Sequence, residues 1–343
     1  MISATNRWKT LTVMTVLAFG LGGCSQDGSI PVQPDDSGGL TTAAGKGKSG
    51  SGDSQVLDPA AVILSTNAAL AAEDAPYRLS MIETITDNPD EAGITVVWKN
   101  VGNKQLGHDF VPGDPRRGAA GGGWSNDANQ ITFAIDPFDG VSFNGVPASV
   151  TTAEILDGMG TWDGVGCSDP GLDQVAAPVD LGVVAFQNNL GGSPFVVADI
   201  MFGGWLEVEY AGGTIAATHT FIWIDDEGNP TDIDGNGALD VAWREIYFDA
   251  VCQACVPVTF WNWEIDDGID EPGREIDIES IVLHEAGHGL SMAHFGIGFV
   301  RFDGVLYETS NAVMAAAYAG PRTDLAGADN GGHCSNWGSW PGI

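Results

Sequence analysis

The stretch His284-Glu285-Ala286-Gly287-His288-Gly289-Leu290-Ser291-Met292-Ala293-His294 carries the most information about this chain. Residues four apart lie on one face of a helix, so His284 and His288 can present their imidazoles to one ion. Gly289 allows the helix to end soon after the second ligand, and His294 on the returning chain can supply a third nitrogen. Three protein ligands with an open fourth position are the usual arrangement of catalytic zinc.

Glu285 sits beside this ligand set rather than facing away from it. Zinc held in this way lowers the pKa of bound water to roughly 7, and Glu285 is placed to take that proton. The competing interpretation is a polar helix face on which the H-E-x-x-H pattern arose by chance. The third histidine argues against chance, because the chain has only 6 His and three of them fall within this stretch.

The ends of the histidine-bearing helix are readable. Asp277 is a good N-cap, and Glu279 lies in the first turn, where negative charge is favoured. We expect the helix to run from Ile278 to about Leu290, with an apolar flank that anchors the ligands.

These residues resemble the metzincin zinc endopeptidases, and most closely their matrixin branch. Met314, in the run Asn311 to Tyr318, fits the family's methionine turn, which implies that it packs beneath the three histidines. Tyr318 matches a position where many metzincins carry a tyrosine near the zinc, which implies a role in stabilising the oxyanion. Without the motif, Met314 would read as ordinary core packing. The family has glycine where this chain has Ser291, and a serine at positive φ costs roughly 1 kcal/mol.

Weaker similarity extends over residues 92–343. It implies an α+β, zincin-like fold with a twisted, mostly parallel sheet and one antiparallel edge strand, packed on the long zinc-binding helix and a second helix. The segments that carry it are a first strand at 130–136, a helix at 150–162, a central strand at 198–202, the edge strand at 214–221 and a further strand at 245–249. The resemblance implies that a peptide substrate adds to the edge strand near His219 to Trp223, and that Ala315 to Pro321 walls a pocket.

Two departures from the family matter. Matrixins often hold a second, structural zinc, but here His219 alone could serve and Tyr247 stands where a histidine is expected, so we predict no complete second zinc site. Matrixin propeptides also carry a cysteine that blocks the zinc. The only cysteine before the catalytic region here is Cys24, which has another expected role.

Composition narrows the class of protein. The chain has 343 residues, with 46 acidic and 13 basic residues and a formal net charge of -33. This charge excludes generic nucleic-acid binding, which needs a basic surface. It suits a secreted protein that charge keeps soluble, and one that binds Ca²⁺.

The N-terminus reads as a targeting segment. A basic start and the apolar run Leu11 to Leu21 lead to Leu21-Gly22-Gly23-Cys24, which resembles a bacterial lipobox. Residues 1–23 are then a lipoprotein signal peptide and Cys24 the lipidated residue, with an unlipidated secretory signal as the alternative. Residues 24–56 read as a flexible tether rich in Gly and Ser. Residues 57–91 read as a pro-segment or an entry helix, with Asp58 as N-cap and Pro59 at the first helical position.

Four cysteines remain, and an even number in an exported protein suggests disulfides. Three pairings are open; in one, Cys252 and Cys255 close on each other and leave Cys167 with Cys334. Redox chemistry or metal binding by the C-x-x-C is the weaker interpretation, since no second C-x-x-C accompanies it.

A second group of metal-ligand residues follows the pattern D-x-D-x-N-G-x-x-D. It supplies oxygens from Asp232, Asp234, Asn236 and Asp240, at the first, third, fifth and ninth positions of a calcium loop. The twelfth position, usually a bidentate glutamate, is Trp243. The alternative is a simple turn, which Asp, Asn and Gly favour in any case.

Together these features predict an exported zinc endopeptidase, lipid-anchored to the bacterial cell envelope or surface, or else secreted. We expect a monomer that acts on protein or peptide substrates and meets the membrane through its lipid. The competing hypotheses are a non-catalytic zinc- or calcium-binding surface lipoprotein of the same fold, and a calcium-binding adhesion module with an incidental histidine cluster.

Overall fold

The computed structural model describes residues 56–87, 93, 95–99, 107–117, 129–137, 146–206, 209–210, 213–252, 259–265, 275–295, 298–300, 306–308 and 311–342. The expected signal peptide, Cys24 and nearly all of the tether lie outside these residues. None of the described helices has the length and apolar character needed to cross a membrane.

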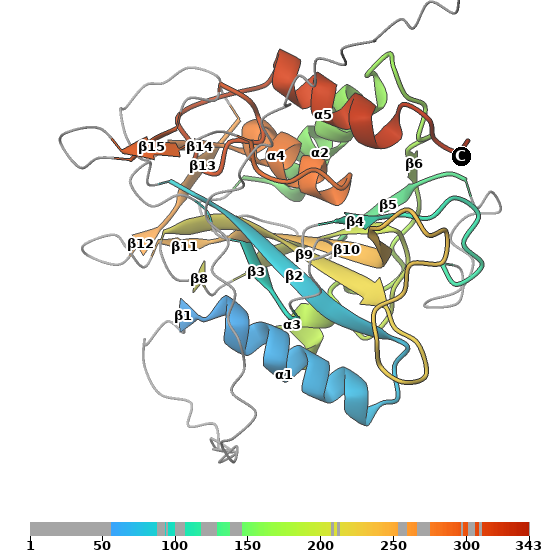
Figure 1. The fold of residues 1–343 in the computed structure, drawn as a ribbon. Coiled ribbons are helices and arrows are strands. Elements are labelled where there is room, and N and C mark those ends of the chain that lie inside the picture. The colour runs from blue at the N-terminus through green and yellow to red at the C-terminus, as the bar shows by residue number, and fades with distance from the viewer. Residues whose placement is uncertain are drawn as a thin grey trace, which may run out of the picture.

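The fold is mixed α/β, with a sheet between two layers of helices (Figure 1). The helices are α1 (Pro59–Ala72), α2 (Ala148–Asp163), α3 (Val183–Gln187), α4 (Ile278–Gly289) and α5 (Gly327–Trp337). The main sheet contains β2 (Tyr77–Thr86), β3 (Thr95–Val97), β4 (His108–Asp109), β5 (Thr132–Ile135), β6 (Asp173–Gln174), β7 (Ile200–Leu206), β9 (Thr214–Trp223) and β10 (Leu239–Asp249). The remaining strands form small two-stranded pairs: β1 (Val56–Leu57), β8 (Glu209–Tyr210), β11 (Val251–Cys252), β12 (Thr259–Phe260), β13 (Asn262–Glu264), β14 (Glu275–Asp277), β15 (Gly298–Val300) and β16 (Leu306–Glu308).

The main sheet runs in the order β3-β2-β9-β10-β7-β5-β6, with β4 beside β10. Four pairings are parallel, namely β10–β7, β7–β5, β5–β6 and β10–β4, and the pairings β2–β3, β2–β9 and β9–β10 are antiparallel. The expected mostly parallel sheet is therefore present, and its antiparallel strands gather at one side.

The expected edge strand is not at an edge. β9 pairs with β10 on one side and with β2 on the other, over nearly the whole length of both strands. All ten residues of β9 are buried. Resemblance to other proteins could not reveal this, because β2 comes from the segment 57–91, which lies outside the region of similarity.

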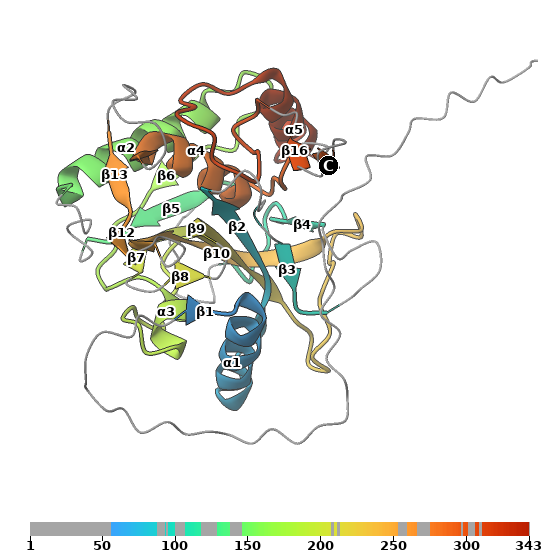
Figure 2. The ribbon, with the colours of Figure 1, turned by 90° about the vertical axis from the view of Figure 1, so that its left-hand side faces the viewer.

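The two faces of the sheet carry separate hydrophobic cores. One core lies between the sheet and α2 with α4, and contains Trp162, Ile200 and Met314. The other lies against α1 and α3 and contains Leu70, Leu79 and Trp243. Figure 2 shows the same layers from the side, with α1 below the sheet and α2, α4 and α5 above it.

Several predicted elements are confirmed at nearly their expected bounds. α4 begins after Asp277, whose carboxylate accepts a hydrogen bond from the Ser280 amide at 2.7 Å. α1 begins after Asp58, which caps the Ala60 amide in the same way. The helix expected at 150–162 is α2, and its Trp162 donates from Nε1 to the Leu283 carbonyl of α4 at 2.9 Å.

A disulfide joins Cys167, just after α2, to Cys334 in α5. This is one of the pairings left open by the sequence. Cys252 ends β11, and Cys255 lies outside the described residues.

Candidate metal centre

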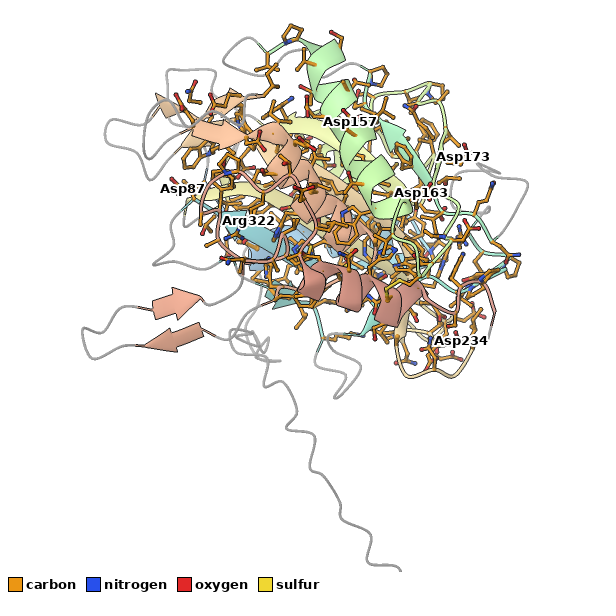
Figure 3. The ribbon with its side chains drawn as sticks, turned by 90° about the horizontal axis from the view of Figure 1, so that it is seen from above. Asp87, Asp157, Asp163, Asp173, Asp234 and Arg322 are labelled. Atoms are coloured by element: carbon orange, nitrogen blue, oxygen red, sulfur yellow. A yellow bond between two sulfur atoms is a disulfide. The ribbon has the colours of Figure 1, made fainter. Side chains whose placement is uncertain are left out.

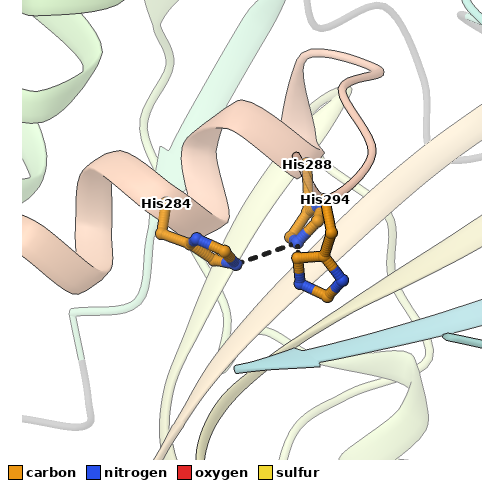
Figure 4. Close-up of side chains that lie close together, drawn as sticks. All are labelled: His284, His288 and His294. Carbon is orange, nitrogen blue, oxygen red and sulfur yellow. Dashed lines mark hydrogen bonds between the residues drawn. The ribbon is translucent and has the colours of Figure 1, made fainter. Parts of the chain in front are cut away.

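The three motif histidines converge on one point (Figure 4). His284 and His288 project from the last two turns of α4, and His294 comes from the chain after the turn. The Nε2 atom of His288 lies 3.0 Å from Nε2 of His284 and 3.1 Å from Nε2 of His294. His284 and His288 are fully buried, and His294 is half-buried.

Backbone carbonyls fix the orientation of two of these rings. His284 Nδ1 donates to the Val313 carbonyl at 2.8 Å, and His288 Nδ1 donates to the Met292 carbonyl at 2.7 Å. Each Nδ1 therefore carries the proton, and each Nε2 presents a lone pair toward the shared point. Burial lowers the pKa of His284 to about 4 and the pKa values of His288 and His294 well below their usual range, so the rings stay neutral.

This donor set fits a zinc ion. Two lone pairs that face each other at 3.0 Å with no proton between them repel unless a cation lies there. Neutral imidazoles whose other nitrogen is bonded to a carbonyl are the usual form of histidine ligands. Among the described residues, only this trio and the cluster Asp232, Asp234 and Asp240 bring three metal-binding side chains together.

Glu285 lies on the same helix and is fully buried. Its Oε2 accepts a hydrogen bond from the Thr218 hydroxyl of β9 at 2.5 Å, whereas its Oε1 has no hydrogen-bond partner among the described residues. Burial raises the pKa of this carboxyl well above its usual range, and the nearby Glu83 raises it further. One oxygen is thus held by the sheet, and the other is unbonded among the described residues.

Met314 packs directly against α4 at Gly287, and its place beneath all three histidines stays a prediction. It is fully buried, and a Cβ placed on Gly287 would come within 2.2 Å of its Sδ. Gly287 lies between the two helical histidines in the sequence, and its missing side chain lets Met314 approach the helix at that point.

The Tyr318 hydroxyl does not lie with the histidines. It accepts a hydrogen bond at 3.0 Å from the amide of Asp277, at the opposite end of α4. Burial raises the pKa of this hydroxyl to about 12. The expected oxyanion role would require the ring to leave this position.

Ser291 has the left-handed backbone expected where the family has glycine, with φ of 66°. Its hydroxyl accepts a hydrogen bond from Arg244 Nη1 at 2.9 Å, and the same nitrogen donates to the Gly289 carbonyl. Arg244 is 1% exposed and reaches these groups from β10. The strained turn at Ser291 is therefore hydrogen-bonded to the buried Arg244 guanidinium.

Two residues that support the centre were not anticipated from the sequence. Arg244 could have been noticed, because an arginine is rare in the middle of an otherwise buried strand. Asp329 of α5 is fully buried, and its carboxylate accepts from the amides of Val313 at 2.9 Å, Met314 at 3.1 Å and Ala326 at 2.8 Å. Asp329 holds the segment whose Val313 carbonyl orients His284. No sequence motif around Asp329 indicated this role.

The expected calcium loop lies at the periphery of the molecule, where Figure 3 labels Asp234. Asp232, Asp234 and Asp240 approach each other, with one oxygen from each within 4.8 Å of the others. Asp240 is bonded to Arg116 Nη2 at 2.7 Å and to the Thr231 hydroxyl. Its carboxylate therefore already has a cationic partner.

Asn236 completes the loop through its side chain. Its Nδ2 donates to Asp109 Oδ2 at 2.6 Å and to Asp234 Oδ2 at 3.1 Å. Burial raises the pKa of Asp109 to about 6. These bonds organise the loop from within, and calcium binding stays a prediction.

His219 lies on the other face of the sheet from α4. Its Nε2 is 2.6 Å from the Tyr210 hydroxyl, and its ring meets the ring of Tyr247 edge to face. Burial lowers the pKa of His219 to about 3. Tyr247 donates to Glu245, which also accepts from the amides of Val183 and Val184. His219 belongs to this buried polar network.

No protein-family model matches this chain, and no curated protein is significantly similar to it in sequence. The resemblance to metzincins thus rests on the motifs and on the arrangement of residues described above.

Proposed function

We propose that this protein is a zinc-dependent endopeptidase of the metzincin type. The observation that carries the proposal is the convergence of three neutral imidazole nitrogens, two of them oriented by backbone carbonyls, on a helix that also carries the buried Glu285. When bound, zinc would supply a Lewis acid that lowers the pKa of water and polarises a peptide carbonyl.

The chain's own residues would divide the remaining work. His284, His288 and His294 hold the ion. Glu285 takes up a proton at Oε1 from the attacking water and later gives it to the leaving amine, while Thr218 holds Oε2. Met314 gives α4 a rigid apolar floor.

The central test compares Glu285→Gln with the parent protein. Gln keeps the shape but cannot take up the proton, so cleavage of an unstructured protein should fall by roughly 100- to 10,000-fold. Zinc content, measured by mass spectrometry, should stay at one ion per chain. Glu279→Gln, on the first turn of the same helix, is the matched control and should cleave normally.

The result that contradicts the proposal is full cleavage by Glu285→Gln. A folded protein without zinc would contradict it as well. Parent activity should also disappear with a chelator and return with added zinc.

A non-catalytic zinc- or calcium-binding surface protein is the second candidate. The observation in its favour is that His284, Glu285 and His288 are all fully buried. Zinc binding without cleavage of any unfolded protein, under conditions that open the site, would favour it.

We also propose that the chain is exported and lipid-anchored through Cys24. The lipobox-like sequence before Cys24 and the cysteine pair Cys167–Cys334, which suits an oxidising compartment, support this location. Mass measurement of the protein isolated from membranes, with and without Cys24→Ser, tests for the lipid.

A further inference from the structure

β2 runs along the outer side of β9, next to the metal centre. The two strands are antiparallel, and their register places Glu83 opposite Thr218 and Thr84 opposite Ala217. Thr218 is the residue that bonds Glu285. The C-terminal half of β2 therefore lies directly beside the proposed general base.

The same half-strand also pairs with the segment Ala316–Tyr318. Thr86 pairs in parallel with Ala317, and its carbonyl accepts from the Tyr318 amide at 2.7 Å. Gly93, which follows β2, donates to the Ala316 carbonyl at 2.7 Å. This segment comes directly after Val313 and Met314, which orient and support His284.

The side chain of Glu83 lies behind one of the three histidines, on the side of the ring that faces away from the shared point. It is 2% exposed, and its Oε2 lies 3.4 Å from Nδ1 of His288. In Figure 4 the blue strand below the imidazoles is β2. One stretch of the chain thus pairs with the strand that holds Glu285 and also contacts a histidine of the centre.

An extended peptide binds beside a metal by hydrogen bonding to a free row of backbone groups. Two described backbone rows adjoin residues of this centre, namely β9, which holds Glu285, and Ala316–Tyr318, which follows Val313 and Met314. Both rows are bonded to β2 or to Gly93. A substrate and β2 cannot use the same groups at once.

We propose that residues 83–86 of β2 act as an internal plug that closes the metal centre, and that peptides reach it only after this half-strand separates from β9 and from Ala316–Tyr318. The inference rests on the proposed endopeptidase function, whose regulation it describes. α1 anchors the strand that carries the plug, because the Asn67 side chain bonds both the amide and the carbonyl of Leu79 in the N-terminal half of β2, at 2.7 and 2.9 Å.

A cross-link tests whether the plug must move. Thr84 and Ala217 are opposite each other, buried, and on the face of the sheet away from α4. The double variant Thr84→Cys/Ala217→Cys should form a disulfide that locks β2 to β9. Oxidised and reduced samples of this variant are compared, with the parent under the same reductant as control.

A second variant tests whether loosening β2 opens the metal centre. Asn67→Ala removes two hydrogen bonds that hold β2 and should favour the open state. Asn188→Ala is its matched control, since it removes bonds from Asn188 to Ser65 and Thr66 of α1 without touching β2.

Two readouts separate the inference from the proposed function. The first is cleavage of a labelled unstructured protein. The second is binding of a tripeptide hydroxamate to the Co²⁺-substituted protein, followed by the visible absorption of Co²⁺, which reports access without requiring catalysis. Oxidation of the double variant should weaken both by about tenfold or more, and Asn67→Ala should strengthen both, whereas Asn188→Ala should change neither.

Equal hydroxamate binding by the parent, by Asn67→Ala and by the oxidised double variant would overturn the inference. If oxidation of the double variant weakens hydroxamate binding but no form of the protein cleaves the labelled protein, the plug is supported and the endopeptidase proposal fails.

Discussion

Replacing Ser291 measures how the strained turn after α4 is stabilised. A non-glycine residue in the left-handed region costs roughly 1 kcal/mol, which glycine would recover. The hydrogen bond from the Arg244 guanidinium to the Ser291 hydroxyl opposes this cost. A bond to a charged group contributes roughly 1.5–3 kcal/mol, and the lower value applies here because Ser291 is only half-buried.

The two terms predict an order of stability. Ser291→Gly loses the bond but removes the strain, so its free energy of unfolding should fall by about 0.5–1 kcal/mol. Ser291→Ala loses the bond and keeps the strain, so it should fall by about 1.5–2 kcal/mol. The protein should therefore be most stable with serine and least stable with alanine.

The assay is urea unfolding of zinc-saturated protein at neutral pH, with far-ultraviolet circular dichroism as the signal. Equal slopes for the three proteins are needed for the comparison. The reasoning fails if Ser291→Gly is more stable than the parent, because the turn would then be dominated by backbone strain and the bond to Arg244 would contribute nothing.

Two further changes probe the residues around the centre. Asp329→Asn replaces one acceptor oxygen by a donor that faces backbone amides, so it should destabilise the protein by about 3 kcal/mol. It should also weaken zinc binding by about 10- to 100-fold, because Val313 no longer holds its place. Competition with a chromophoric chelator measures the zinc affinity, and Asn330→Ala on the same helix should leave that affinity unchanged. His219 has a folded-state pKa of about 3, below its unfolded value of 6.5, so the unfolded chain binds the extra proton and stability falls as pH drops below about 6.5. Between pH 6.5 and 5 this loss is about 2 kcal/mol, and His219→Gln should remove it; an acid-induced loss of the same size in both proteins would refute the assignment.

Local features of the metal centre could be predicted because neighbouring residues determine them. The spacing of His284 and His288 requires a helix, Asp277 caps it, and the position of Ser291 requires a left-handed turn. Each of these follows from a few consecutive residues and from the geometry of one helix end.

The environment of the centre could not be predicted, because it depends on contacts between distant parts of the chain. The sequence of β2 does not say which strand it joins, and its partner β9 lies more than 100 residues later in the sequence. The bonds from Asp329 to Val313 and Met314 likewise arise only when α5 is packed in place. The expectation that β9 is an edge strand was wrong for the same reason, because the sequence does not show that β2 pairs with it.

The disulfide between Cys167 and Cys334 divides the chain into a covalent ring, an N-terminal arm and a short C-terminal tail. The ring, with a sequence separation of 167 residues, contains β9, α4 and all three histidines. Closing a loop of this length restricts the unfolded chain by about 5 kcal/mol, and that gain is confined to the ring. α1, β2 and β3 precede Cys167 and belong to the arm. A cut in the chain between β3 and Cys167 would therefore leave the ring that carries the three histidines covalently closed.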